Sequence, residues 1–173
     1  MSNVRTLQAA LTFFLFLAIA SPARPATCDA EPFVQTAGQA MLRAARSRSA
    51  SALAGVVNRY GDVRGLAYFA LGAHRNKLPK SKDTEYISLT REFVGRFLAK
   101  HASKFTASSL IVTSCTGDSK SMTVTAKLSS GQKIILRLYK TKNGYVARDM
   151  NIASIWLGQQ MRTTFTGVIN RNG

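Results

Sequence analysis

The sequence predicts an α+β domain with N-terminal helices, a four-stranded antiparallel meander sheet and a C-terminal helix. Three observations carry this prediction. Apolar residues recur every three or four positions as far as Phe105, which is the period of a helix with one buried face. After Phe105 they alternate with polar residues, which is the period of a strand, and turn signals separate the runs. The helical period returns from Ser154 onwards.

The first residues have the order of regions that marks a secretory signal peptide. Arg5 precedes an apolar run at 9–20, and small residues follow the run. Prolines end it before it reaches the ~20 apolar residues that a membrane-spanning helix needs. We therefore expect residues 1–23 to be removed after export, with cleavage as late as residue 26, and residues 24–173 to form one domain.

Four helices are expected between this leader and the strands. The first opens on Glu31 and Pro32, an acid and a proline that suit a first helical turn. The segment 76–83, which contains Pro79, is expected to be a loop. The helices are predicted over Glu31–Arg48, Ser49–Tyr60, Asp62–Gly72 and Thr84–Lys104.

Four strands and a last helix are expected in the rest of the chain. Asn143 followed by Gly144 is a strong signal for a two-residue hairpin, and other glycine-containing pairs separate the remaining runs. Because one face of these strands is apolar and the other polar, helices should cover one side of the sheet. The strands are predicted over Leu110–Cys115, Ser121–Leu128, Lys133–Tyr139 and Tyr145–Ile152, and the helix over Ser154–Asn170.

The chain is strongly basic, with a formal net charge of +16. Such a charge attracts polyanions, which include nucleic acid and the headgroup layer of anionic lipids. Charge alone does not choose between these two partners. Because the protein is expected to be exported from the cytoplasm, nucleic acid is the less expected of the two partners.

Cys28 and Cys115 are the two cysteines of the chain. In an oxidising compartment such a pair is a candidate disulfide, which would close a loop of about 90 residues. Two separate thiols are the alternative. A metal site is not expected, because there is no Cys-x-x-Cys motif and His74 and His101 lie far from both cysteines in the sequence.

No catalytic constellation stands out in the sequence. The eight acidic residues are scattered, and the chain has no Gly-x-Ser-x-Gly, no glycine-rich phosphate loop and no His-Glu-x-x-His. We therefore expect a protein that is not an enzyme and that uses no cofactor. Large apolar side chains are abundant instead, and their periodicity fits both a filled core and a cavity for an apolar ligand.

Four stretches carry a resemblance to a known family. Tyr60–Gly72 ends in Ala-Leu-Gly, and Phe93–His101 has the spacing Phe-x-x-x-Phe-Leu. Gly144–Ile152 is similar to Trp-x-Val-x-Asp-Val-x-Val. Ile155–Ile169 has an arginine and a phenylalanine, Arg162 and Phe165, at the positions where the family has them. They resemble the MlaC family of periplasmic phospholipid-binding proteins, also called toluene-tolerance auxiliary proteins.

The resemblance implies a periplasmic shuttle that buries the acyl chains of a phospholipid between helices and sheet. The shuttle would serve an ABC-type lipid transport system that maintains outer-membrane lipid asymmetry. Its partners would be an inner-membrane ABC transporter complex and an outer-membrane lipoprotein complex, with no nucleic acid. Arg162 and Arg137 are expected to meet the headgroup at a basic mouth. The acyl chains are expected to contact Phe69, Phe93, Phe97, Leu136, Leu138, Met150, Ile152, Trp156, Leu157, Met161 and Phe165.

The sequence departs from the family pattern at several of these positions. Tyr145 replaces the usual Trp, and Trp156 and Met161 replace Ser and Tyr. We expect Trp156 to narrow the pocket or to change which lipid fits. A hopanoid-associated branch of the family is similar, so a polycyclic lipid is an alternative ligand. A basic secreted module that binds nucleic acid or anionic surfaces, without an internal ligand, is the alternative from another functional class.

Overall fold

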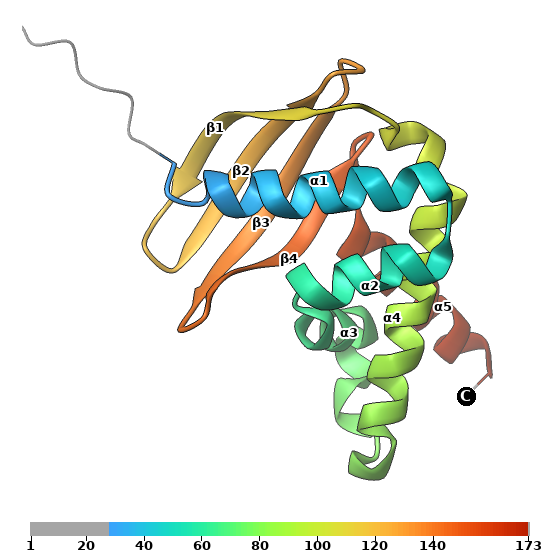
Figure 1. The fold of residues 1–173 in the computed structure, drawn as a ribbon. Helices are drawn as coiled ribbons and strands as arrows, with labels where there is room; N and C mark the ends of the chain where they lie inside the picture. The colour runs from blue at the N-terminus through green and yellow to red at the C-terminus, as the bar shows by residue number, and fades with distance from the viewer. Residues whose placement is uncertain (1–27, 173) are drawn as a thin grey trace, which may run out of the picture.

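A computed structural model describes residues 28–172, and the predicted signal peptide lies outside them. The α+β prediction is confirmed, with helices before and after an antiparallel sheet. Figure 1 shows one helix crossing a face of the sheet and the other helices packed together beside it. The helices are α1 (Glu31–Ser47), α2 (Ala50–Tyr60), α3 (Val63–Leu71), α4 (Asp83–Lys100) and α5 (Leu157–Asn172), with the 3₁₀ turns η1 (Gly72–Lys77), η2 (Lys80–Lys82) and η3 (Ala102–Phe105).

The sheet is a meander in which each strand pairs with the next one in the chain. Its order is therefore β1-β2-β3-β4-β5, and every pair is antiparallel. Helix α1 crosses one face of this sheet, while α2, α3 and α5 contact it at β4 (Figure 1). The strands are β1 (Leu110–Gly117), β2 (Ser121–Leu128), β3 (Lys133–Thr141), β4 (Gly144–Ile152) and β5 (Ile155–Trp156).

Polar side chains set where the early helices begin. The Ser49 hydroxyl accepts a hydrogen bond from the Ala52 N–H at 3.2 Å at the start of α2, and the Asp62 carboxylate accepts one from the Gly65 N–H at 2.8 Å at the start of α3. Both satisfy an N–H that has no partner within its own helix. Arg48 follows α1 with a φ of 50°, a left-handed conformation that turns the chain directly towards α2.

The segment before α4 and the C-terminal end of that helix differ from the sequence prediction. The segment 76–83 is not an open loop, because η1 and η2 fold most of it into 3₁₀ turns. Helix α4 ends at Lys100 rather than Lys104. The His101 N–H bonds to the carbonyls of both Phe97 and Leu98, so the α-helical ladder tightens there into the 3₁₀ turn η3.

A fifth strand lies where the sequence predicted the start of the last helix. Ala153 and Ser154 have φ values of 51° and 65°, and this tight turn folds β5 back onto β4. Helix α5 therefore begins at Leu157. Ile155 and Trp156 are residue types that favour strands. A strand of two residues is too short to show the alternation of apolar and polar side chains that predicts a strand from sequence.

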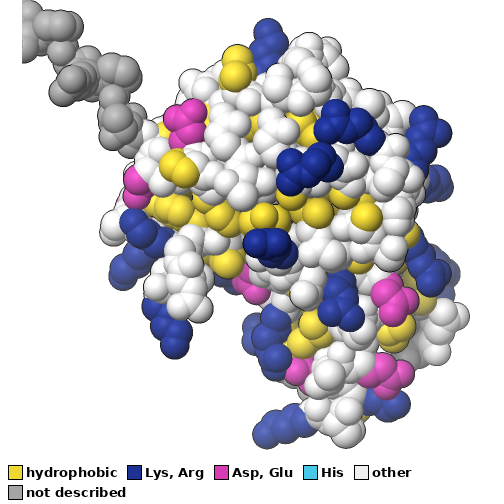
Figure 2. Space-filling model, in the orientation of Figure 1, with side chains coloured by type: hydrophobic (Ala, Val, Ile, Leu, Met, Phe, Trp, Pro, Cys, Tyr) yellow, Lys and Arg dark blue, Asp and Glu magenta, His cyan; other side chains and the backbone are white. Residues whose placement is uncertain are grey.

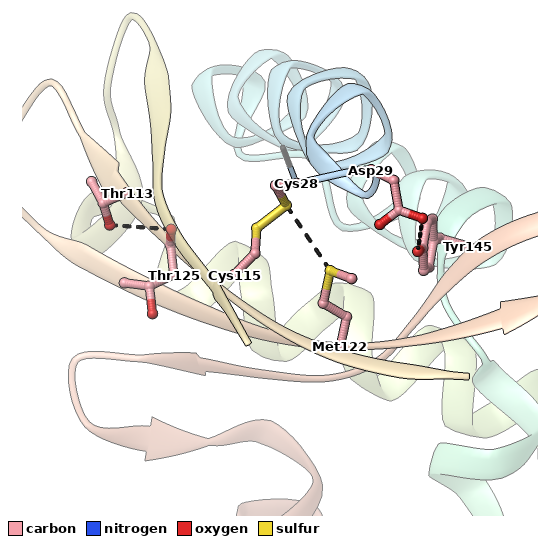
Figure 3. Close-up of a disulfide and its surroundings, with 7 residues drawn as sticks. All are labelled: Cys28, Asp29, Thr113, Cys115, Met122, Thr125 and Tyr145. Atoms are coloured by element: carbon pink, nitrogen blue, oxygen red, sulfur yellow. Dashed lines mark hydrogen bonds between the residues drawn. A yellow bond between two sulfur atoms is a disulfide. The ribbon is translucent and has the colours of Figure 1, made fainter. Parts of the chain in front are cut away.

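A disulfide joins Cys28 to Cys115, with their Cα atoms 5.8 Å apart. Figure 3 shows that it links the segment before α1 to strand β1, with the Sδ atom of Met122 4.0 Å from the Cys28 Sγ atom. Strand β1 is at the edge of the sheet and has a bulge between Val112 and Ser114. The bond therefore fixes the start of the described chain to an edge strand, which pairs with β2 alone.

The hydrophobic core joins the helices to the face of the sheet that α1 crosses. Leu42 of α1, Leu98 of α4, Phe105 of η3 and Val124 of β2 are almost fully buried in it. Among the described residues, no helix has both the length and the apolar character needed to cross a membrane.

Candidate functional site

An apolar cavity lies between α1, α2 and the sheet. Its empty volume is about 960 Å³, part of which is open to solvent. Its wall is almost wholly apolar, and the charged residues in the wall are Asp62, Arg148 and Asp149. Figure 2 shows a band of apolar side chains on the face that α1 crosses, with Lys and Arg side chains on both sides of the band. Such a space favours an apolar ligand, because it removes the ligand surface from water.

Most of the helical wall of the cavity comes from one face of α1 and one face of α2. Phe33, Ala37 and Met41 of α1 line it, as do Val56 and Tyr60 of α2. Residues four positions apart lie above one another on a helix, so each set forms a continuous apolar surface. This surface faces the sheet across the cavity.

Gly38 brings α1 close to the edge of the sheet. A Cβ atom at this position would collide with the side chain of Leu110, the first residue of β1. Only glycine therefore permits this approach without a shift of the neighbouring side chain. Both residues also line the cavity, so this contact closes its β1 side.

The opposite wall is the inner face of three strands. Ala126 of β2, Ile134 and Leu136 of β3, and Met150 and Ile152 of β4 line it. Ile134 is paired with Ile152, and Leu136 with Met150, across β3 and β4. Alternate residues of a strand point to the same face, which explains why the apolar set of each strand faces α1.

A β-bulge lies in β4 beside the cavity. Arg137 is paired with Asp149 and Leu138 with Ala147, so Arg148 is the extra residue of β4. The Arg148 Nε atom lies 3.8 Å from the Asp62 Oδ2 atom. The Asp62 N–H donates to the Ala147 carbonyl at 2.8 Å, and this bond holds the junction of α2 and α3 against β4.

Asp149 links the sheet to the start of α5. Its Oδ1 atom accepts hydrogen bonds at 2.9 Å from the Gly158 and Met150 N–H groups, and its Oδ2 atom lies 4.0 Å from the Arg137 Nη1 atom. Burial raises the pKa of the Asp149 carboxyl above its ordinary value, and the two N–H groups and Arg137 act in the opposite direction. The Asp149 carboxylate therefore already has hydrogen-bond partners within the protein.

The structure brings together four of the residues expected to contact acyl chains. Leu136, Met150, Ile152 and Leu157 all line the cavity. The last three also line a smaller hollow of about 410 Å³ together with Phe97, on the α4 side of the sheet.

The other expected tail contacts lie outside the main cavity. Phe93 packs against Phe165 with ring centroids 5.0 Å apart, which fills the space between α4 and α5. Leu138 and Met161 are fully buried in the core. Phe69 lies in an open cleft of about 1020 Å³ between α3 and the strands, a cleft that Leu138 also lines.

Trp156 and the two expected headgroup arginines also lie outside the cavity wall. The Arg137 guanidinium stands 3.9 Å from the centre of a Trp156 ring, and that of Arg162 stands 5.0 Å from the centre of the Phe69 ring. Arg137 lines the open cleft beside α3. The cation that lines the apolar cavity is Arg148, which the sequence reasoning did not select.

The described residues offer no set of three or more His, Cys, Asp or Glu side chains that could hold a metal ion. What residues 28–172 do offer is a cavity whose wall is almost wholly apolar. Such a cavity is suited to holding an apolar molecule.

Comparison with known proteins identifies the fold and the family of this chain. No curated protein matches the chain. A solved structure, the phospholipid-binding protein from Ralstonia solanacearum in complex with a phospholipid, has the same fold, with a TM-score of 0.71 and 18% sequence identity over 84% of this chain and 90% of that one. The family model described as MlaC protein matches residues 34–173. By this match over most of its length, the chain belongs to the MlaC family.

Proposed function

We propose that this protein is a periplasmic carrier that binds a phospholipid with its acyl chains in the apolar cavity. The observation that carries the proposal is the cavity itself, whose wall is apolar on both the helical and the sheet side. Membership of the MlaC family and the fold shared with a phospholipid-binding protein support it.

The physical role of the cavity is to offset the cost of exposing lipid tails to water. Each exposed CH₂ group is unfavourable by about 0.8 kcal/mol, so a two-chain lipid leaves a membrane very slowly without a carrier. A preformed apolar enclosure lowers this cost and requires no covalent step. We therefore propose that the protein is not an enzyme and that the lipid is its only ligand.

The transport role is proposed on the basis of the family. The carrier would receive lipid from an outer-membrane lipoprotein complex or an inner-membrane ABC transporter complex and deliver it to the other, which would maintain outer-membrane lipid asymmetry. The leader at residues 1–23 would direct it to the periplasm. The disulfide between Cys28 and Cys115 suits that oxidising compartment.

Organic extraction of the purified protein, followed by mass spectrometry, tests the ligand directly. We expect about one phospholipid per protein chain. A polycyclic lipid in the extract would support the hopanoid alternative, and an extract without lipid would contradict the carrier function.

A cavity-filling substitution tests the location of the ligand. Ala37→Phe places a ring in the cavity from the middle of the α1 stripe, so we expect it to reduce the extracted lipid severalfold. Ala52→Phe makes the same change at an exposed position of α2 and should leave the lipid content unchanged. Equal lipid content in the two variants would place the ligand elsewhere.

A further inference from the structure

The open cleft beside α3 lies on the face of the sheet opposite α1. Thr123 of β2, and Arg137 and Tyr139 of β3, line it, and each of them alternates along its strand with residues that face α1. Phe69 belongs to the α3 side of the cleft. The cleft is therefore a second space, separate from the apolar cavity and open to solvent along part of its length.

Two guanidinium groups line this cleft with donors that the protein does not use. Arg137 and Arg148 donate no hydrogen bond within residues 28–172, and their side chains are 57% and 47% exposed. The Arg137 group lies 3.9 Å from the centre of a Trp156 ring, and the Arg148 group lies 4.7 Å from the centre of the Tyr139 ring. These contacts hold both groups in place. A guanidinium held in this way is suited to phosphate oxygens.

The neighbouring carboxylates do not occupy these donors. Asp149, the one acid in the cleft wall, has its Oδ2 atom 4.0 Å from the Arg137 Nη1 atom. Asp62, which lines the apolar cavity instead, has its Oδ2 atom 3.8 Å from the Arg148 Nε atom. Both distances are too long for a hydrogen bond. The cleft wall thus sets two cations against one carboxylate, a balance that favours an anion.

Aromatic rings and hydroxyl groups complete the cleft. Phe69 and Tyr139 are each 44% exposed, although both have large apolar rings. The hydroxyl groups of Thr116, Thr123 and Tyr139 also line the cleft and donate no hydrogen bond within the described part of the chain. Exposed rings can pack against a planar ring of a ligand. This mixture of groups suits a ligand class different from that of the apolar cavity.

We propose that the cleft binds a soluble aromatic phosphate monoester, with its phosphate held by Arg137 and Arg148 and its ring against Phe69 and Tyr139. A phosphate monoester carries close to two negative charges at neutral pH, which matches two guanidinium groups. The proposal does not depend on a lipid in the apolar cavity, because the two ligands would occupy opposite faces of the sheet.

Calorimetric titration at constant ionic strength tests the ligand class. We expect phenyl phosphate to bind saturably with a Kd of about 0.1–1 mM. Inorganic phosphate should bind about two- to tenfold more weakly because it has no ring to stack. No saturable binding of phenyl phosphate up to about 10 mM would overturn the proposal. Equal affinity for inorganic phosphate would contradict the role of the two rings.

Arg137→Gln tests the location of the phosphate. We expect the affinity for phenyl phosphate to fall about two- to fivefold. Arg137→Lys should recover only part of the loss, because an ammonium group lacks the planar fork of donors. Arg43→Gln is the matched control, since it removes the same charge from an exposed position of α1 away from the cleft. Equal losses in Arg137→Gln and Arg43→Gln would reveal unspecific attraction and contradict the site.

Trp156 is the single tryptophan of the chain and reports on Arg137. Phosphate bound to Arg137 should change the emission of Trp156 with the Kd that calorimetry gives. Unchanged emission on saturation would place the ligand away from Arg137 and contradict the site.

Two further measurements separate this site from lipid binding. Arg137 does not line the apolar cavity, so Arg137→Gln should retain the lipid extracted from the wild type. Loss of that lipid would contradict a separate site. Binding of phosphatidylglycerol vesicles without binding of phenyl phosphate would overturn the proposal and assign the cleft to a membrane surface. Saturable phenyl phosphate binding by a protein that yields no lipid would support the cleft and contradict the carrier function alone.

Discussion

Asp149 shows how one side chain positions two elements at the edge of the cavity. Its carboxylate accepts the Gly158 N–H at the start of α5 while its backbone belongs to β4. The side chain is 12% exposed, so the N–H groups that it satisfies have little access to water. Loss of the acceptor therefore leaves a buried donor without a partner.

We predict that Asp149→Ala lowers the free energy of unfolding by about 1–3 kcal/mol. Asp149→Asn retains an acceptor oxygen and should stay within about 1 kcal/mol of the wild type at pH 7. Urea unfolding followed by circular dichroism measures both values. Equal losses in the two variants would show that the charge of Asp149, rather than its hydrogen bonds, holds the start of α5.

The raised pKa of Asp149 predicts a pH dependence with a defined sign. Burial makes the folded state bind a proton more readily than the unfolded state, whose carboxyl has a pKa of about 3.8. The stability gained from this protonation is complete below that pH and is lost as the pH rises through the folded-state pKa. Unfolding measured from about pH 3.5 to 7 should show the wild type losing stability relative to Asp149→Asn. A constant difference between the two proteins would contradict the pKa shift.

At the scale of elements, the contact between α2 and α4 depends on a glycine. A Cβ atom on Gly95 would collide with the backbone carbonyl of Ala50 and lie 2.8 Å from the Ala54 Cβ atom. Backbone atoms cannot rotate away, so the two helices would have to separate. Gly55 lies on the exposed side of α2 and has no atom within 4 Å of a Cβ built on it.

Gly95→Ala is therefore predicted to lower the free energy of unfolding by about 1–3 kcal/mol through overpacking. Gly55→Ala should raise it by about 0.4–1 kcal/mol, because alanine favours the helix and restricts the unfolded chain. Thermal unfolding of the two single variants compares the same chemical change at a packed and an open position. A stabilising effect of Gly95→Ala would show that α2 and α4 are less tightly packed than the structure indicates.

The disulfide joins the segment before α1 to edge strand β1 across 87 residues of sequence. We predict that Cys28→Ser combined with Cys115→Ser lowers the free energy of unfolding by about 2–5 kcal/mol. Wild-type protein treated with dithiothreitol should unfold at the same denaturant concentration as the double variant. No effect of reductant on the wild type would mean that the two thiols are separate in the purified protein.

For the whole molecule, the order of elements follows from sequence periodicity, but the cavity does not. The change of period after Phe105 predicts the helix-to-sheet transition, and short turns predict the meander. A stripe such as Phe33, Ala37 and Met41 has the same spacing whether it faces a filled core or an open space. The volume between two apolar surfaces depends on how far apart the backbones lie, which a one-dimensional pattern does not contain.

The expected tail contacts include several large rings, and the size of these side chains explains why they lie outside the main cavity. Large rings fill space, and Phe93 and Phe165 pack against each other between α4 and α5. The cavity persists where the wall has short side chains, such as Ala37, Ala126 and Ala147. Arg148 was missed because its position depends on a bulge in β4, and no residue pattern in the strand marks that bulge.

A ligand that fills the cavity should stabilise the whole fold. Protein refolded from guanidinium without lipid is predicted to melt at a lower temperature than protein purified with its ligand, because binding to the folded state alone adds about 2.7 kcal/mol at a hundredfold excess over Kd. Phospholipid added during refolding should restore the melting temperature of the wild type. It should have little effect on Ala37→Phe, whose cavity is filled. Equal melting temperatures with and without lipid would contradict ligand binding inside the fold.

The attachment of α1 at both ends limits how a guest can enter. One end is anchored by a covalent sulfur bridge, and the other passes into α2 through only Arg48 and Ser49. Because both of its ends are attached, α1 cannot rotate away from the sheet about one end. The opposite wall, where Asp62 meets Ala147 and Arg148, is fastened only by weak, reversible contacts. A local opening is therefore easier on that side than by an outward movement of α1.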